Sequence, residues 1–249
     1  MFRMDGRACI VTGASSGLGA RFAEVLHAAG AIVVLAARRR ERLDDLASRL
    51  DRAVAVECDV ASEADRARLV ATAERECGRV DVLVNNAGVS QMVRMERESL
   101  EQWEETFAVN VTAVHRLALL AGAGMLERGS GVVVNVASMY GFVARWDIPG
   151  AASYAATKAA VVNLTRELGA QWARRGVRVN GLAPGYFPSE MTGDGLDDSR
   201  FRDRLDRRCP AGRPGRPHEL DGALLFLASD ASSYMVGQTI VVDGGWTAV

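Results

Sequence analysis

The 249-residue sequence is poor in the residues that build metal centres and disulfide frameworks. It contains four cysteines and three histidines, without a C-x-x-C pair, and His27, His115 and His218 lie far apart. Scattered cysteines in or beside apolar segments are typical of small buried side chains, and separated histidines make no ligand motif. The sequence therefore predicts neither a structural nor a catalytic metal, and it favours a reducing, cytoplasmic setting.

An excess of charge of either sign is also missing. The chain has 30 Lys plus Arg against 31 Asp plus Glu, a net charge of −1 at pH 7. This balance gives no electrostatic reason to expect a nucleic acid or an anionic membrane as partner. No continuous apolar run reaches the roughly 18 residues that span a bilayer. The segment from Met1 to Asp5 lacks the apolar stretch of a signal peptide.

Lysine is nearly absent: Lys158 is the only one among the 30 basic residues, so the other 29 are arginines. It lies four positions after Tyr154, in a segment without proline that predicts a helix over residues 152–175. At this spacing the two side chains share one helix face. A nearby ammonium lowers the pKa of a phenol, which is ordinarily about 10. The pair therefore predicts a general acid/base near neutral pH. The alternative is a solvated lysine beside a packing tyrosine.

Short apolar segments alternate with helical ones along the whole chain. Strands are expected at residues 7–12, 31–37, 53–58, 80–84, 131–137, 177–182 and 238–242. Helices are expected at 20–29, 43–50, 61–77, 99–127, 152–175 and 219–228. This alternation predicts an α/β fold: one Rossmann-like, doubly wound parallel sheet of about seven strands, with helices on both faces.

Nothing in the sequence divides the chain, so residues 1–249 are expected to form a single dinucleotide-binding and catalytic domain. Residues 188–216 stand out because proline, glycine, aspartate and arginine are dense there and apolar periodicity is weak. We expect a loop-rich flap over a substrate site, or else a solvated excursion of the chain.

A glycine motif lies between the first expected strand and the first expected helix. Gly13, Gly17 and Gly19 allow a tight turn and a close backbone approach to a ligand. The following helix offers free N–H groups and a partial positive charge to phosphates. This setting favours dinucleotide binding over simple packing of a turn.

Further motifs follow one another along the chain. They are Thr12-Gly13-x-x-x-Gly17-x-Gly19, Asn85-Asn86-Ala87-Gly88, Asn110, Ser138, Tyr154-x-x-x-Lys158, Pro184-Gly185 and Val242-Asp243-Gly244-Gly245. In this order they resemble the classical short-chain dehydrogenases/reductases, from about residue 7 to residue 245. The resemblance implies an oxidoreductase that interconverts a ketone and a secondary alcohol. Reduction of 3-oxoacyl thioesters and non-catalytic nucleotide sensing are the alternatives.

The resemblance also implies a catalytic tetrad. Tyr154 would exchange a proton with the substrate oxygen, while Lys158 would lower its pKa and hold the nicotinamide ribose. Ser138 would bind the substrate oxygen and stabilise the developing oxyanion, and Asn110 would hold a water in the proton relay. Ser138 and Tyr154 are 16 positions apart. This is about three more than is usual in the family, which implies a longer loop within residues 140–151.

NADP(H) is implied as the preferred cofactor, with NAD(H) as the alternative. Ala37 stands where NAD enzymes carry an acid, and Arg38 follows it, suited to a bidentate grip on a 2′-phosphate. Arg39 and Arg40 are interpreted as a solvated charge run. The implied cofactor contacts are Gly13, Ser15, Ser16, Gly17, Leu18, Gly19, Arg38, Asp59, Val60, Asn86, Ala87, Gly88, Tyr154, Lys158, Pro184, Gly185, Phe187 and Ser189.

Family analogy places seven residues around the substrate: Gln91, Met139, Tyr140, Arg145, Trp146, Tyr186 and Met191. Arg145 and Trp146 fall in the lengthened loop, where they would contact a carboxylate or a ring; exposed packing is the alternative. The arginine-rich segment 200–216 is interpreted as a solvated, salt-bridged helix face rather than a clamp for an anionic substrate. The homotetramer usual in the family is expected by analogy.

Overall fold

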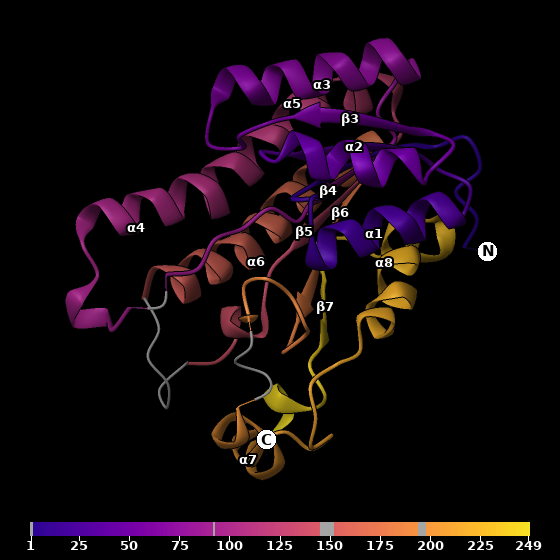
Figure 1. The fold of residues 1–249 in the computed structure, drawn as a ribbon. Helices are drawn as coiled ribbons and strands as arrows, with labels where there is room; N and C mark the ends of the chain where they lie inside the picture. The colour runs from indigo at the N-terminus through magenta and orange to yellow at the C-terminus, as the bar shows by residue number, and fades with distance from the viewer. Residues whose placement is uncertain (1, 92, 145–151, 194–197) are drawn as a thin grey trace.

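Seven parallel strands form one sheet in the order β3-β2-β1-β4-β5-β6-β7 (Figure 1). The computed structural model describes residues 2–91, 93–144, 152–193 and 198–249. The strands are β1 (Ala8–Thr12), β2 (Ile32–Ala37), β3 (Ala53–Glu57), β4 (Val82–Asn85), β5 (Gly131–Val136), β6 (Val177–Pro184) and β7 (Thr239–Val242). The strand order reverses between β1 and β4, and ligands of such sheets bind in the crevice at that point. The predicted α/β fold is confirmed.

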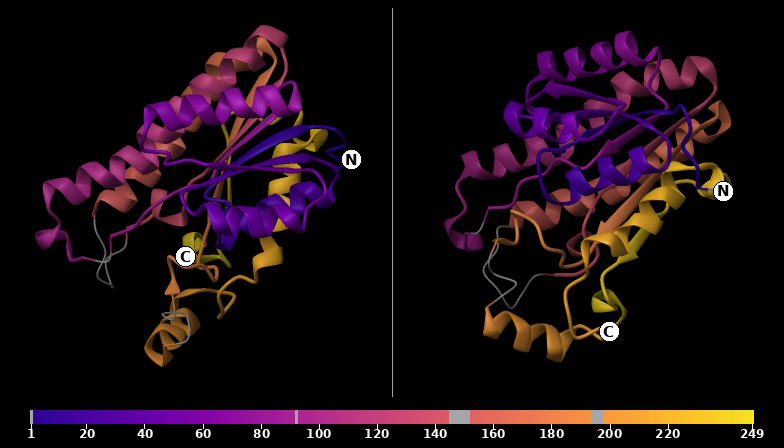
Figure 2. Two further views of the ribbon diagram at one scale, coloured as in Figure 1. Left: turned by 45° about the horizontal axis from the view of Figure 1, so that its top comes forward. Right: turned by 45° about the vertical axis from the view of Figure 1, so that its right-hand side comes forward.

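Helices cover both faces of the sheet (Figures 1 and 2). Strands β1, β4 and β5 are buried at every residue, as expected for parallel strands between two helical layers. Successive β1 side chains divide between the layers, since Ile10 and Val11 belong to different apolar clusters. One layer holds α1 (Gly17–Ala28), α2 (Arg40–Ser48) and α8 (Asp221–Ala228); the other holds α3 (Glu63–Cys77), α5 (Ala113–Arg128) and α6 (Ala152–Trp172).

The helix expected at residues 99–127 is one rod with an irregular middle. It consists of α4 (Leu100–Phe107), a π-helical turn η2 (Ala108–Thr112) and α5. Ser99 and Gln102 begin it with a reciprocal capping box. The rod is long and apolar enough by length and composition to cross a membrane, yet 44% of its apolar window is buried inside the protein. It packs on α3 and α6 as a core helix does.

Helix α7 (Ser199–Arg208) lies within the segment expected to be rich in loops. It packs next to the C-terminal turn, which Figure 2 shows beside it. The interpretation of a solvated arginine face is wrong for Arg204, which is only 7% exposed. Its guanidinium carbon lies 5.7 Å from the centroid of the Tyr186 ring and 5.0 Å from that of Trp246. This burial follows from cation–π packing on two rings that are distant in sequence.

Candidate active site

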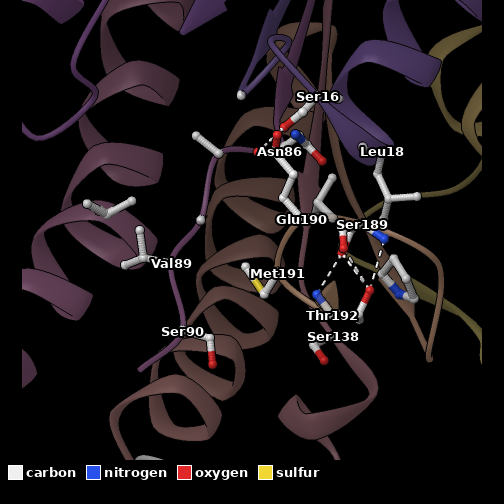
Figure 3. Close-up of a pocket in the computed structure, with 18 of the residues that line it drawn as sticks. Ser16, Leu18, Asn86, Val89, Ser90, Ser138, Ser189, Glu190, Met191 and Thr192 are labelled. Atoms are coloured by element: carbon white, nitrogen blue, oxygen red, sulfur yellow. Dashed lines mark hydrogen bonds between the residues drawn. The ribbon is translucent and has the colours of Figure 1, made fainter. Parts of the chain in front are cut away.

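The glycine turn, the carboxyl ends of the central strands and the first turns of α6 surround one cavity of about 540 Å³. Every implied cofactor contact lines it, and so does Ser138 (Figure 3). Among the expected substrate residues, Met139, Tyr140, Tyr186 and Met191 line it as well.

Other predicted site residues lie elsewhere. Asn110 is buried behind the cavity wall and Gln91 is not among the lining residues. Gln91 instead donates to a carboxylate oxygen of Glu105, at 3.3 Å. Arg145 and Trp146 lie outside the described residues.

The turn from β1 into α1 has the shape that a dinucleotide phosphate group requires. Gly13 and Gly17 have φ of +69° and +54°, in the left-handed region that favours glycine. A Cβ on Gly19 would lie 2.2 Å from the carbonyl oxygen of Gly13, so this position tolerates no side chain. The N-cap residue Ser16 makes no side-chain cap hydrogen bond, so its hydroxyl does not occupy the first N–H groups of α1. Both features fit a phosphate at the helix N-terminus.

Hydrogen bonds connect the end of β1 to the segment that follows β4. The Thr12 hydroxyl accepts from the backbone N–H groups of Asn86 and Ala87, each at 3.0 Å. The Asn86 amide donates back to the Thr12 carbonyl at 2.8 Å. Asn85 points the other way and donates to Asn135 on β5, at 2.9 Å. Asn85 and Asn86 therefore both brace the sheet, while only Asn86 also lines the cavity.

Tyr154 and Lys158 lie on one side of α6, as their spacing predicts. The Lys158 Nζ is 5.7 Å from the centroid of the Tyr154 ring and donates to the carbonyl of Val136 at 2.9 Å. Lys158 is 4% exposed, and this burial lowers its pKa to about 8. The amine is therefore still mainly protonated at neutral pH, and little water screens its charge from the phenol.

Ser138 follows β5 and begins a wall of hydroxyl groups. It is buried, and its Oγ accepts from the backbone N–H of Tyr140 at 3.2 Å. The phenol oxygens of Tyr140 and Tyr186 are 2.5 Å apart. Arg204 donates to the Tyr140 hydroxyl at 3.4 Å. This side of the cavity therefore presents hydroxyl groups backed by a buried positive charge.

Asn110 is held inside the π turn by hydrogen bonds to another part of the chain. Its Oδ1 accepts from the N–H of Val89 at 2.9 Å, and its Nδ2 donates to the Val89 carbonyl at 2.9 Å and to Thr157 at 3.1 Å. A Cβ on Gly88 would lie 3.3 Å from this Oδ1 and 3.5 Å from Lys158 Nζ. Asn110 thus fixes the chain after β4 against α6, beside the lysine. A water held by Asn110 stays a prediction.

Two lining residues were not expected at the nucleotide end of the cavity. Arg39 donates to Ser15 and Ser16 and forms an ion pair with Glu190. Its side chain is 42% exposed, as a solvated run predicts, but these contacts were not expected. Arg40 does pair with Asp44 on the outer side of α2. Glu190 is 151 residues from Arg39 in sequence, so no local pattern could have identified the contact.

Within the described part of the chain, no group of three or more His, Cys, Asp or Glu side chains is arranged to hold a metal ion. The four cysteines are free thiols, and three of them are buried.

Comparison with known proteins covers nearly the whole chain. Residues 13–247 match a family model described as enoyl-(acyl carrier protein) reductase. Gluconate 5-dehydrogenase of Gluconobacter oxydans is 41% identical over 251 residues, which cover 99% of this chain and 97% of the relative. The 3-oxoacyl-[acyl-carrier-protein] reductase of Thermotoga maritima is 35% identical over 247 residues, or 98% of each chain.

A solved structure is similar to this protein over the whole chain. The crystal structure of a gluconate 5-dehydrogenase from Burkholderia cenocepacia, in complex with NADP and tartrate, is similar with a TM-score of 0.94. It is 40% identical and the match covers 100% of this chain and 98% of that one. The motifs, the fold and the relatives agree, and the chain belongs to the short-chain dehydrogenase/reductase family of oxidoreductase enzymes.

Proposed function

We propose that this protein is an NADP(H)-dependent oxidoreductase that interconverts a ketone and a secondary alcohol on a polyhydroxylated acid. The observation that carries the proposal is that Ser138, Tyr154 and buried Lys158 share one cavity with the glycine turn. A sensor would need the nucleotide half of this cavity but not a buried amine beside a phenol. We therefore prefer an enzyme to a non-catalytic nucleotide-binding protein.

Tyr154, Lys158 and Ser138 would have different roles in the proton transfer. The Tyr154 phenol donates a proton to the substrate oxygen during reduction and accepts it during oxidation. The Lys158 ammonium favours the phenolate, because an opposite charge stabilises the ionised form. The Ser138 hydroxyl donates to the same substrate oxygen and stabilises the charge that develops on it. A bound nicotinamide supplies the hydride chemistry.

The proposed cofactor, NADP(H), is inferred from residues that line the nucleotide end of the cavity. The glycine turn would hold the pyrophosphate, and Arg38 and Arg39 line the cavity where a 2′-phosphate would reach. The similar Burkholderia enzyme has NADP bound. We propose NADP(H) as the preferred cofactor, with NAD(H) as the second choice.

The substrate class is proposed from the hydroxyl wall and the relatives together. Tyr140 and Tyr186 offer donors and acceptors to a chain of hydroxyl groups, and Arg204 adds positive charge behind them. Relatives at 41% and 40% identity are gluconate 5-dehydrogenases. Reduction of 3-oxoacyl thioesters is the second candidate, because a reductase of that class is 35% identical.

One assay separates these candidates. Purified protein is given gluconate with NADP⁺ or with NAD⁺, and separately an acetoacetyl thioester with NADPH, while NAD(P)H absorbance is followed. We expect gluconate or another sugar acid to react faster with NADP⁺ than with NAD⁺. Faster turnover of the thioester would select the second candidate, and no hydride transfer with any substrate would contradict the enzyme proposal.

Three further features are proposed by family analogy. Residues 188–216 would act as a flap over the substrate end of a single catalytic domain, and Met191 and Thr192 at its start do line the cavity. The protein would assemble as a homotetramer and work in the cytoplasm on a small molecule.

A further inference from the structure

The nucleotide end of the cavity already holds an anion that belongs to the protein itself. The Glu190 carboxylate accepts from two nitrogens of Arg39, at 3.0 and 2.8 Å. It also accepts from the Ser16 hydroxyl at 2.8 Å (Figure 3). Arg42 donates to the same carboxylate. A carboxylate held by two guanidinium groups and a hydroxyl is bound as a phosphate would be.

This cluster lies where enzymes with a Rossmann fold distinguish NADP from NAD. Arg39 directly follows Arg38 after the end of β2, where a basic side chain accommodates a 2′-phosphate. Ser15, Ser16, Arg39 and Glu190 all line the cavity of the glycine turn. Arg39 and Ser16, two of the groups that would contact the phosphate, are therefore engaged by Glu190.

The contact also fixes the start of the flap against the glycine turn. Glu190 is contributed by the segment after β6, while its partners are contributed by the β1–α1 turn, by the N-cap residue of α2 and by α2 itself. A Cβ on Gly17 would lie 3.3 Å from the Cβ of Ser189, so the two segments are already in close approach. An anion that displaces Glu190 would release this segment.

We propose that Glu190 is an intramolecular competitor for the 2′-phosphate of NADP(H), and so a residue that determines cofactor specificity. The inference rests on the proposed function, since it concerns the same cofactor site. NAD(H) binds with the Glu190–Arg39 contact intact, whereas NADP(H) binds only after the carboxylate has moved away. Glu190 therefore weakens NADP(H) binding selectively and couples the 2′-phosphate to the position of the flap.

The solvent exposure of these charged side chains limits the effect of Glu190 on NADP(H) affinity. The side chains of Arg39, Glu190 and Arg42 are 42%, 50% and 53% exposed, so solvent screens their ion pairs. Because NADP(H) must displace Glu190, its apparent affinity is reduced in proportion to the fraction of molecules in which the carboxylate has already left the site. For a screened but multiply hydrogen-bonded contact we expect a factor of about ten.

The test is a binding measurement that needs no turnover. Calorimetry at fixed ionic strength compares NADP⁺, NAD⁺, 2′,5′-ADP and 5′-AMP on the wild type and on Glu190→Gln, which keeps the side-chain shape and removes the charge. We expect NADP⁺ and 2′,5′-ADP to bind about tenfold more tightly to Glu190→Gln, while NAD⁺ and 5′-AMP change by less than about twofold. Asp44→Asn is the matched control: it removes one negative charge from α2 beside Arg40 and should leave every affinity within about twofold.

A second measurement uses only the wild-type protein. Hydrogen exchange of residues 186–193 should be faster with 2′,5′-ADP bound than with 5′-AMP bound, because only the former displaces Glu190. An unchanged NADP⁺/NAD⁺ affinity ratio in Glu190→Gln, or equal exchange with both nucleotides, would overturn the inference. If the wild type bound both dinucleotides but the ratio did not move, the inference alone would fail. If it bound neither, the proposed function would fail with it.

Discussion

Lys158 Nζ and the carbonyl oxygen of Val136 are 2.9 Å apart, and this hydrogen bond connects α6 to the end of β5. It directs the buried amine toward the side of the helix that carries Tyr154. The sheet therefore positions the ammonium of Lys158, and the helix positions the phenol of Tyr154. Both β5 and α6 are rigid elements, and a site for proton transfer needs side chains that are held in a fixed geometry.

Replacing Tyr154 with phenylalanine should separate binding from chemistry. The variant loses the proton donor but keeps the ring that packs beside Lys158, so we expect turnover to fall by about 10²–10⁴-fold. The dissociation constant for NADP⁺ should stay within a few-fold of the wild-type value. Steady-state kinetics and calorimetry on the same preparation measure both. Retained turnover would contradict the role assigned to Tyr154.

Burial of Lys158 should make the stability of the protein depend on alkaline pH. Its pKa is about 8 in the fold against an ordinary 10.5, so between these values the unfolded chain binds the proton and the native protein does not. The free energy of unfolding then rises with pH through this window, by up to about 3 kcal/mol from this group. Below pH 8 the lysine is charged in both states and the cost of burying the charge is fully present.

Lys158→Met isolates this contribution, because methionine fills similar space without a charge. Urea unfolding of both proteins from pH 7 to pH 10 should show the wild type gaining stability relative to the variant as the pH rises. Two curves that stay parallel over the whole range would refute the assignment.

Glu98 should position Tyr154 without touching the cavity. Its carboxylate accepts from the Ser153 hydroxyl and, at 3.3 Å, from the Ser153 backbone N–H, at the first turn of α6. Ser153 is fully buried and directly precedes Tyr154. A negative charge at this end also stabilises the helix through its dipole.

For Glu98→Gln we therefore expect about tenfold lower kcat, an unchanged KM for NADPH and about 1 kcal/mol lower stability. Glu96→Gln is the matched control, because Glu96 forms an exposed pair with Arg94 at 3.9 Å. If the two variants gave equal kinetics, the contact with Ser153 would have no positioning role.

Reversing the charge of Arg38 should change cofactor preference. Arg38→Asp places an acid next to Ala37, the position where NAD enzymes carry one, and repels a 2′-phosphate, so the ratio of kcat/KM for NADP⁺ over NAD⁺ should fall by at least about tenfold. Arg40→Asp is the control, since Arg40 pairs with Asp44 and does not line the cavity. An unmoved ratio in Arg38→Asp would show that Arg39 alone reads the phosphate.

The sheet and most helices could be predicted from the sequence because their signals are local. Buried strands such as Ile32–Ala37 are continuous apolar runs, and the helices between them have regular spacing. The cofactor cradle was predictable for the same reason, since its glycines are required by a turn within seven residues of chain.

The unpredicted features all depend on contacts between distant segments. The π turn at Asn110 is held by Val89, the burial of Arg204 depends on Trp246, and Glu190 contacts Arg39 across most of the chain. None of these partners leaves a periodic signal in the sequence. Arginine and glutamate side chains are usually solvated, so a sequence predicts them to be exposed. Only the folded chain shows that Arg204 is buried.

The π turn also constrains how this chain can vary. One residue more than a regular turn puts α4 and α5 out of phase by about 100°, the rotation of a single helical step. Deleting one residue within Ala108–Thr112 would let the rod relax to uniform winding. The stacked rings of Trp103 and Phe107 would then swing around the axis relative to α5, and Asn110 would leave Val89. A one-residue gap at this turn would thus mark a homologue in which the contact between Asn110 and Val89 had been replaced.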